Sequence, residues 1–214
     1  MIILVGGEKG GTGKTTLVTN LAAMRRNQEG DVLVIDTDKQ GSASYWAATR
    51  EGNEELHRVP SIQKFGSAIA SEIRDLANRY QDIIIDAGGR DSIELRAAMT
   101  VVEKLIIPIQ ASQFDVWTLG AMSDLVNQAI AFNEGLKTFV VVNRASTNPS
   151  VSETAEAKEV LEDFENLVLL KTVIHDRIAY RKAAKSGLSV VELQPKDLKA
   201  AKEMTSLYKE VFHE

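Results

Sequence analysis

Short apolar runs alternate along this chain with longer stretches whose apolar positions recur at helical spacing. The runs occupy residues 2–5, 32–35, 83–85, 105–109, 139–142 and 167–170. Because they are continuous, and do not alternate with polar residues, they indicate strands that are buried on both faces. Such strands alternating with helices predict an α/β fold, a doubly wound and mostly parallel sheet flanked by helices, with ligand-binding loops at the carboxyl ends of the strands. We expect residues 1–214 to form a single domain.

A glycine-rich segment follows the first predicted strand directly. Residues 6–16 read Gly-Gly-Glu-Lys-Gly-Gly-Thr-Gly-Lys-Thr-Thr, and a helical pattern begins at Thr16. Glycines let the backbone turn tightly so that its N–H groups point into one concavity, and the dipole of the following helix adds positive potential there. The segment therefore predicts a phosphate-binding loop, in which Lys14 reaches the β- and γ-phosphates and Thr15 ligates magnesium.

The loop departs from the strict Walker A pattern, because that pattern requires glycine where this chain has Glu8. Residues 9–16 instead read K-G-G-T-G-K-T-T, with a second lysine at the front. This sequence resembles the deviant Walker A motif of the ParA/MinD family of ATPases. The resemblance implies a P-loop fold of the SIMIBI kind that binds ATP and Mg²⁺. It assigns nucleotide contacts to Gly10, Gly11, Thr12, Gly13, Lys14, Thr15 and Thr16.

The resemblance also implies a mechanism. Two protomers sandwich ATP face to face, and Lys9 crosses to the phosphates of the opposite subunit. Lys9 and Lys14 would then stabilise the charge that develops on the transferring phosphoryl group. The implied activity is a slow, Mg²⁺-dependent ATP hydrolysis that a partner protein stimulates.

Two aspartates follow the second predicted strand, at residues 36 and 38. The segment resembles the family's switch I, usually D-x-D-P-Q, with Lys39 where proline is common. By that resemblance Asp38 positions or activates the attacking water, and Asp36 supports the magnesium ion. The alternative is that both aspartates cap the helix that starts near Ser42.

A third carboxylate, Asp86, ends the buried run at residues 83–85 and resembles a Walker B aspartate that holds a water of the magnesium shell. Gly88 or Gly89 would offer a backbone N–H to the γ-phosphate. The segment 87–89 has no proline after the aspartate, a departure from the larger family that looks closer to the short plasmid ParA proteins of the ParF kind. Arg90 is either an arginine finger or an arginine that is solvated or paired with Asp91.

The strand at residues 139–142 ends in Asn143, whose amide has the donors and the acceptor to recognise adenine. The family places an asparagine at this strand end for that purpose. Residues 143–146 lack the aspartate of a guanine-binding motif, which favours ATP over GTP.

A basic segment precedes Gly187. Arg177, Arg181 and Lys185 are spaced to share one helix face, and Lys182 lies among them. The position resembles the one where partitioning ParA proteins make nonspecific DNA contacts, although Ala179 and Lys182 replace the arginine and glutamate usual there. A solvated basic helix is the alternative.

Composition narrows the function classes. The chain has no cysteine, which excludes disulfides and the cysteine-ligated cluster of nitrogenase iron proteins, and its net charge is −5 at pH 7, which disfavours a generally basic DNA-coating protein. No run reaches the length of a bilayer span, and no leader is recognised at residue 1. We therefore expect a cytoplasmic protein without a membrane partner. Its association with the nucleoid is implied only by the resemblance to partitioning ParA proteins. The apolar stripe of the last helix, residues 195–213, predicts docking on the core, with a MinD-like membrane helix as the alternative.

These observations favour a DNA-partitioning ATPase that dimerises on ATP, binds nonspecific DNA and works with a centromere-binding adaptor of the ParB or ParG kind. Three alternatives remain: a related ATPase that positions protein cargo, a MinD-like membrane-cycling regulator, and a metabolic enzyme on the same fold.

Overall fold

The computed structural model describes residues 1–110, 113–148 and 153–213 and is built on a seven-stranded sheet. The strand order is β3-β2-β4-β1-β5-β6-β7, and each neighbouring pair is parallel. The predicted parallel α/β fold is confirmed. The strands are β1 Ile2–Val5, β2 Val32–Asp36, β3 Ser61–Gln63, β4 Asp82–Asp86, β5 Lys104–Ile109, β6 Lys137–Val142 and β7 Val168–Leu169.

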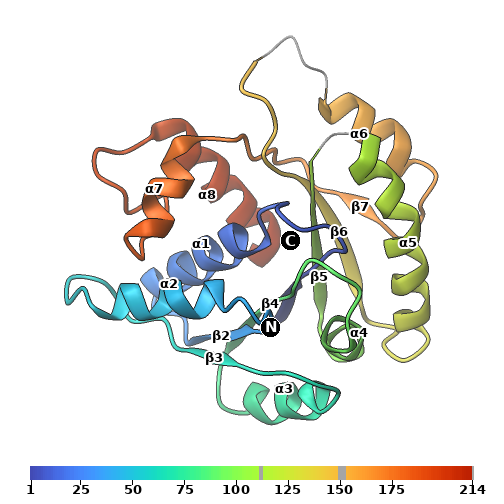
Figure 1. The fold of residues 1–214 in the computed structure, drawn as a ribbon, viewed down its shortest axis with the longest axis horizontal. Coiled ribbons are helices and arrows are strands. Elements are labelled where there is room, and N and C mark those ends of the chain that lie inside the picture. Colours follow the sequence, from blue (N-terminus) through green and yellow to red (C-terminus); the bar gives the residue numbers. More distant parts are fainter. Residues whose placement is uncertain (111–112, 149–152, 214) are drawn as a thin grey trace.

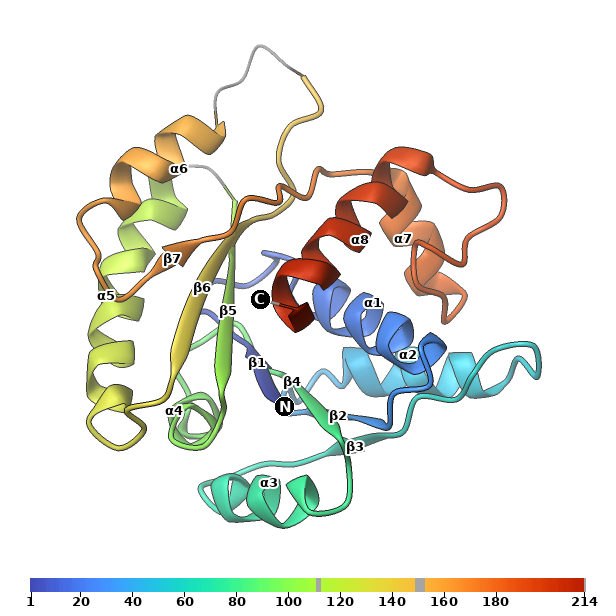
Figure 2. The same cartoon turned by 180° about the vertical axis from the view of Figure 1, so that it is seen from behind.

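Helices cover both faces of the sheet (Figures 1 and 2). One face carries α1 Lys14–Asn27, α2 Ser42–Glu51, α7 Ile178–Lys185 and α8 Leu198–His213. The other carries α3 Ile69–Ala77, α4 Ile93–Met99, α5 Gln113–Ile130 and α6 Glu153–Leu161.

The continuous apolar runs serve both layers at once. In β1, Ile3 and Val5 belong to the hydrophobic cluster under α1 and α8, whereas Leu4 belongs to the cluster on the opposite face. Successive side chains of a strand point to opposite faces, so a strand covered on both sides must be apolar throughout. The sequence pattern therefore indicates the two-sided layering as well as the strands.

The strand after α2 begins later than the apolar pattern predicts. Leu56 and Val59, just before Pro60, predict a short strand at residues 56–59 that the proline ends, but β3 spans Ser61–Gln63 and pairs with β2. The Pro60 carbonyl accepts a hydrogen bond from Val34 N at 2.9 Å. Proline lacks a backbone N–H but keeps its carbonyl, so it precedes this strand and does not end it.

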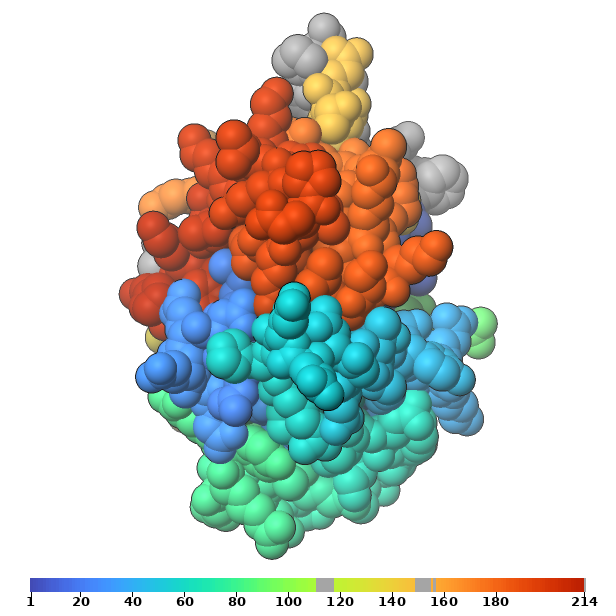
Figure 3. Space-filling view, turned by 90° about the vertical axis from the view of Figure 1, so that its left-hand side faces the viewer, coloured from blue at the N-terminus to red at the C-terminus, as the bar shows by residue number. Residues whose placement is uncertain are grey.

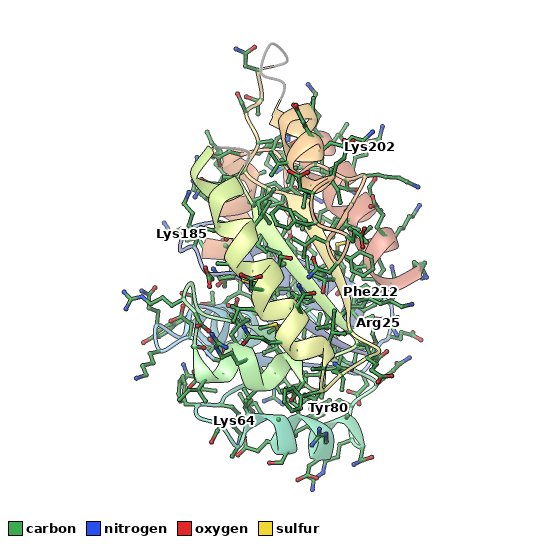
Figure 4. All side chains as sticks on the ribbon, turned by 90° about the vertical axis from the view of Figure 1, so that its right-hand side faces the viewer. Arg25, Lys64, Tyr80, Lys185, Lys202 and Phe212 are labelled. Atoms are coloured by element: carbon green, nitrogen blue, oxygen red, sulfur yellow. The ribbon has the colours of Figure 1, made fainter. Side chains whose placement is uncertain are left out.

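The terminal helix α8 docks on the core, as its stripe predicts. Met204, Leu207 and Tyr208 are fully or almost fully buried, while Leu198, the first residue of the helix, is 74% exposed. Arg25 of α1 lies over the Phe212 ring at 5.4 Å, and Figure 4 shows these two labelled side chains beside each other. No helix among the described residues is long and apolar enough to cross a bilayer.

A buried arginine joins α2 to the segment after α7. The Arg50 side chain has no exposed surface, and it donates to Glu192 through two nitrogens at 2.7 and 2.8 Å and to the Gly187 carbonyl at 3.0 Å. Figure 3 views the molecule from the left-hand side of Figure 1, and there the C-terminal helices lie directly against residues of the α2 region. Nearby lie two adjacent aromatic residues, which their large apolar rings predict to be packed. Trp46 is packed, at 4% exposed, but Tyr45 is 74% exposed, so the prediction is wrong for Tyr45.

Candidate functional site

The glycine-rich loop joins β1, in the middle of the sheet, to α1. Gly13 is the N-cap of α1 and has φ of 90°, in the left-handed region that favours glycine. A Cβ atom at Gly13 would lie 2.4 Å from the Asn143 amide nitrogen. Both the conformation and the close approach therefore require glycine here, and they aim the first turn of α1 at the loop's concavity.

Lys14 is the first residue of α1 and is 7% exposed. Its ammonium donates to the Lys9 carbonyl at 2.7 Å, across the loop. Burial lowers the pKa of the Lys14 ammonium, and the nearby carboxylates of Asp86 and Asp38 oppose that shift. The cation thus lies inside the loop, within the electrostatic reach of both acidic strand ends.

The Thr15 hydroxyl donates to Oδ2 of Asp86 at 2.6 Å, which joins the glycine-rich loop to the end of β4. Asp86 is almost completely buried, and its other oxygen, Oδ1, has no hydrogen-bond partner. Burial raises the pKa of Asp86 to about 7, with Asp36 and Asp38 adding to the shift while Thr15 and Lys14 oppose it. An unpartnered carboxylate oxygen in an acidic, buried environment is a suitable acceptor for a cation or its bound water.

This donor set fits magnesium. Within the described residues, no cluster of acidic or histidine side chains could hold a metal alone. Mg²⁺ is held in nucleotide sites by few protein oxygens, together with phosphates and waters, so the pair of Thr15 and Asp86 is what such a site needs. The predicted magnesium residues Thr15 and Asp86 therefore meet in space.

Asp36 has a different position. Its Oδ1 accepts from Asp38 N at 3.1 Å and its Oδ2 from Ser44 N at 2.9 Å, in the first turn of α2. Asp36 therefore orders the turn between β2 and α2. Its bond to the first turn of α2 agrees with the alternative that Asp36 caps this helix. Its role in supporting magnesium remains a prediction, and it acts on Asp86 through charge.

Asp38 is half-buried and lies beside Gly88, where a Cβ atom would be 3.8 Å from the carboxylate. Its Oδ1 accepts from Gln40 N at 3.0 Å. The carboxylate thus lies between the β2 and β4 loops, and its role in orienting a water remains a prediction.

A cleft of about 1000 Å³ opens where these segments meet. Its walls come from the glycine-rich loop, from residues 37–40 after β2 and from residues 87–90 after β4. At Gly89 a Cβ atom would lie 2.7 Å from Gly10 Cα, so the two backbones are in contact. Lys14, Thr15 and Thr16 line this cleft together with Asp38.

Asn143 lies against the loop and is 2% exposed. Its amide nitrogen donates to the Thr12 carbonyl at 2.6 Å, so in this structure the predicted adenine-binding residue supports the phosphate loop. Adenine contact by Asn143 remains a prediction. Lys9 is half-buried at the front of the loop, and its crossing to a second subunit also remains a prediction.

The predicted basic stripe on α7 does not form. Arg177 is not in the helix but precedes it as the N-cap, with an extended backbone. Its guanidinium is bound by Glu203 of α8 at 2.6 Å, which raises the pKa of Arg177, and its side chain is only 17% exposed. The prediction that Arg177 shares a helix face with Arg181 and Lys185 is therefore wrong, because i, i+4 spacing places residues on one face only within a helix. DNA contact by Arg177 remains a prediction.

The other residues of the stripe point to different surroundings. Arg181 is 63% exposed and lines the cleft, whereas Lys182 and Lys185 are exposed and border other hollows. Arg144, which the sequence did not single out as a site residue, also lines the cleft and donates to the Gly11 carbonyl at 2.6 Å. The available signal was a cation directly after the asparagine that ends a parallel strand.

Curated relatives align over nearly the whole chain. The "Maintenance of carboxysome distribution protein A" of Halothiobacillus neapolitanus is 26% identical over 98% of this chain and 95% of its own length. The protein of the same name from Gloeobacter kilaueensis is 28% identical over 94% and 88%. The sporulation initiation inhibitor protein Soj of Bacillus subtilis is 24% identical over 98% and 97%.

Solved structures show the same fold. Apo McdA from Cyanothece superimposes with a TM-score of 0.78 at 18% identity, covering 98% of both chains. An ATP complex of a Cyanothece McdA variant has a TM-score of 0.76 at 18% identity, covering 98% of this chain and 95% of that one. MinD from Pyrococcus horikoshii, complexed with Mg-ADP, has a TM-score of 0.74 at 18% identity, covering 99% and 95%.

The family model described as the CobQ/CobB/MinD/ParA nucleotide-binding domain matches residues 3–190. That range contains the glycine-rich loop, the acidic ends of β2 and β4, and Asn143. The resemblance to the ParA/MinD family is confirmed, and this chain belongs to the CobQ/CobB/MinD/ParA nucleotide-binding domain family.

Proposed function

We propose that this chain is a ParA-type positioning ATPase, which hydrolyses Mg·ATP in the cleft and uses the ATP cycle to distribute a protein cargo. The observation that carries the proposal is the hydrogen bond between Thr15 and Asp86, a buried carboxylate whose second oxygen has no hydrogen-bond partner and which interacts electrostatically with Lys14. The choice of protein cargo is supported by the two carboxysome-distribution relatives, which align over 95% and 88% of their lengths.

In this proposal each residue has one task. Lys14, which now donates to the Lys9 carbonyl, would bind the phosphates. Thr15 would ligate the metal ion, and Asp86 would hold a water bound to that ion. Bound Mg²⁺ would neutralise charge on the β- and γ-phosphates. Asp38 orients the attacking water, and a positioned carboxylate beside Gly88 suits that role.

We propose that Lys9, the lysine at the front of the loop, makes ATP hydrolysis depend on a dimer. Lys9 would cross to the nucleotide of a second copy, where a cation stabilises the charge of the transition state. Hydrolysis then depends on dimerisation, and a partner protein that favours the productive dimer would accelerate it.

The direct test compares three lysine variants by ATP hydrolysis, nucleotide binding and sedimentation with ATP. Lys14→Ala should lose nucleotide binding, and Lys9→Ala should bind nucleotide but lose dimerisation or hydrolysis. Lys137→Ala changes an exposed lysine at the start of β6, away from the loop, and should match wild type. Normal hydrolysis by Lys9→Ala as a dimer would rule out the sandwich mechanism. Hydrolysis that required a small-molecule acceptor would indicate a metabolic enzyme.

A second candidate is DNA partition with a centromere-binding adaptor of the ParB or ParG kind, because the match to Soj covers 97% of that protein. Deleting the gene from the source cells distinguishes the two. If a protein assembly clusters in the deletion strain while plasmids and chromosomes are inherited normally, the result supports cargo positioning. If plasmids or chromosomes are lost while protein assemblies stay evenly spread, the result supports partition.

A further inference from the structure

Arg144 has a backbone conformation that is uncommon for its residue type. Its φ is 55°, in the left-handed region, and it follows Asn143 directly at the end of β6. Neighbouring hydrogen bonds hold it there: Ala145 N donates to the Ile174 carbonyl at 3.0 Å, and Asp176 N donates to the Ala145 carbonyl at 2.9 Å. Such conformations persist where the surrounding structure fixes them, and they are frequent at functional sites.

The guanidinium of Arg144 joins two segments through two different nitrogens. Nη1 donates to the Gly11 carbonyl at 2.6 Å, and Nη2 lies 3.8 Å from Oδ2 of Asp176. Asp176 in turn accepts from Arg181 Nη1 at 3.2 Å through its other oxygen. A chain of contacts therefore runs from the phosphate loop through Arg144 and Asp176 to α7.

The bond to Gly11 fixes a peptide plane of the loop. In a trans peptide the carbonyl of one residue and the N–H of the next point in opposite directions, so the direction of the Gly11 carbonyl sets that of the Thr12 N–H. Gln110 also donates to the Gly11 carbonyl, at 3.3 Å, and Asn143 holds the next carbonyl, that of Thr12. Phosphate loops bind through backbone N–H groups, so these donors act on the groups that meet the ligand.

We propose that Arg144 is a positioning residue of the phosphate loop, and that Asp176 couples its orientation to α7. This inference rests on the proposed function, since it assumes that the loop binds a nucleotide. It implies that nucleotide affinity depends on Asp176, an acidic residue with no direct phosphate role.

Simple charge attraction predicts the opposite change in nucleotide affinity when Asp176 is replaced. If Arg144 acted only as a cation near the phosphates, Asp176→Asn would remove a negative charge and tighten binding, and Arg144→Lys would retain full affinity. If Arg144 positions Gly11, Asp176→Asn should weaken binding. Arg144→Lys should weaken it too, because one ammonium nitrogen cannot reach both the Gly11 carbonyl and Asp176 as the guanidinium fork does.

The experiment measures Mg·ADP binding by calorimetry, which avoids hydrolysis, for wild type, Arg144→Lys, Arg144→Asn, Asp176→Asn and the double variant Arg144→Asn/Asp176→Asn. Asparagine tolerates the left-handed conformation, so Arg144→Asn removes the guanidinium with little backbone strain. Arg58→Ala is the matched control, because Arg58 is also paired with a carboxylate, Glu51, at 2.8 Å but lies outside the cleft.

We expect about tenfold weaker binding for Arg144→Asn, a smaller loss of about threefold for Asp176→Asn, and no further loss in the double variant. The melting temperature without nucleotide should match wild type, and Arg58→Ala should bind normally. Tighter binding by Asp176→Asn, full affinity in Arg144→Lys, additive losses, or a loss of affinity that follows the melting temperature would each overturn the inference. A wild-type protein that binds neither Mg·ADP nor Mg·ATP would instead overturn the proposed function itself.

Discussion

The Thr15 hydroxyl lies 2.6 Å from Asp86 Oδ2, so the residue expected to ligate magnesium is bonded to the residue expected to hold the magnesium's water. The second oxygen of Asp86 is buried without a hydrogen-bond partner. A buried carboxylate with one unsatisfied oxygen costs free energy when it is charged. The site therefore has an intrinsic reason to take up either a proton or a cation.

The raised pKa of Asp86 predicts how stability depends on pH. The carboxyl titrates near 3.8 in the unfolded chain and at about 7 when folded. Between these values only the folded state holds the proton, so the free energy of unfolding should fall as pH rises, by about 1.4 kcal/mol per pH unit at most. Above pH 7 this contribution is fully lost.

Asp86→Asn removes this titration but keeps an oxygen that accepts from Thr15. We compare the free energies of unfolding of the two proteins in urea, without nucleotide or metal. The value for the variant minus that for wild type should rise by about 2 kcal/mol from pH 5 to pH 7, because only wild type loses this stabilisation. Unfolding curves for the two proteins that change in parallel with pH would contradict a folded-state pKa near 7.

The sequence predicts the parts of this site that belong to single segments. Continuous apolar runs locate most of the strands, and because carboxyl ends of parallel strands meet at one edge, the loop and Asp86 are brought together as expected. Interactions between distant segments leave no such local signal. The ion pair of Arg177 with Glu203 joins residues that are far apart in the sequence and become neighbours only in the fold. The same is true of the hydrogen bond from Arg144 to the Gly11 carbonyl. Helical spacing failed at Arg177 because the helix begins one residue later.

Gly89 should be required for nucleotide use because its backbone lies against the phosphate loop. In Gly89→Ala the new Cβ atom would meet Gly10 Cα at 2.7 Å and Gly10 N at 2.8 Å, so the loop must move. Misplacement of reacting groups by about 1 Å can lower a rate about 100-fold, and we expect a loss of that order in ATP hydrolysis.

Gly120→Ala is the matched control for that experiment. Gly120 lies inside α5, and a Cβ atom there would meet no atom of a neighbouring element within 4 Å. The substitution should leave hydrolysis unchanged and raise stability by about 0.5–1 kcal/mol, since alanine favours helix interiors. Equal losses in the two glycine variants would refute the specific role of the Gly89 contact.

Adjacent aromatic residues on α2 should differ sharply in their contribution to stability. Trp46 is 4% exposed and donates to the Leu188 carbonyl at 3.2 Å, whereas Tyr45 is 74% exposed. Trp46→Ala should lower the free energy of unfolding by about 3–5 kcal/mol. Tyr45→Ala should change it by less than about 0.5 kcal/mol, measured by denaturant unfolding. Similar losses in both variants would mean that Tyr45 is also packed.

Nonspecific DNA binding, if it occurs on α7, should depend on Lys182 and Lys185 and not on Arg177. The two lysines are exposed, while Arg177 is held by Glu203 at 2.6 Å. A lysine that contacts a phosphate releases counterions, so removing both should lower the slope of log affinity against log salt by about 2 at unchanged stability.

Arg177→Ala should instead cost about 1.5–3 kcal/mol of stability, because it leaves Glu203 without its arginine partner. Anisotropy with duplex DNA and ATP at several salt concentrations, beside urea unfolding, separates the two effects. A lower salt slope in Arg177→Ala at wild-type stability would return Arg177 to the DNA face and show that the Glu203 pair opens on binding.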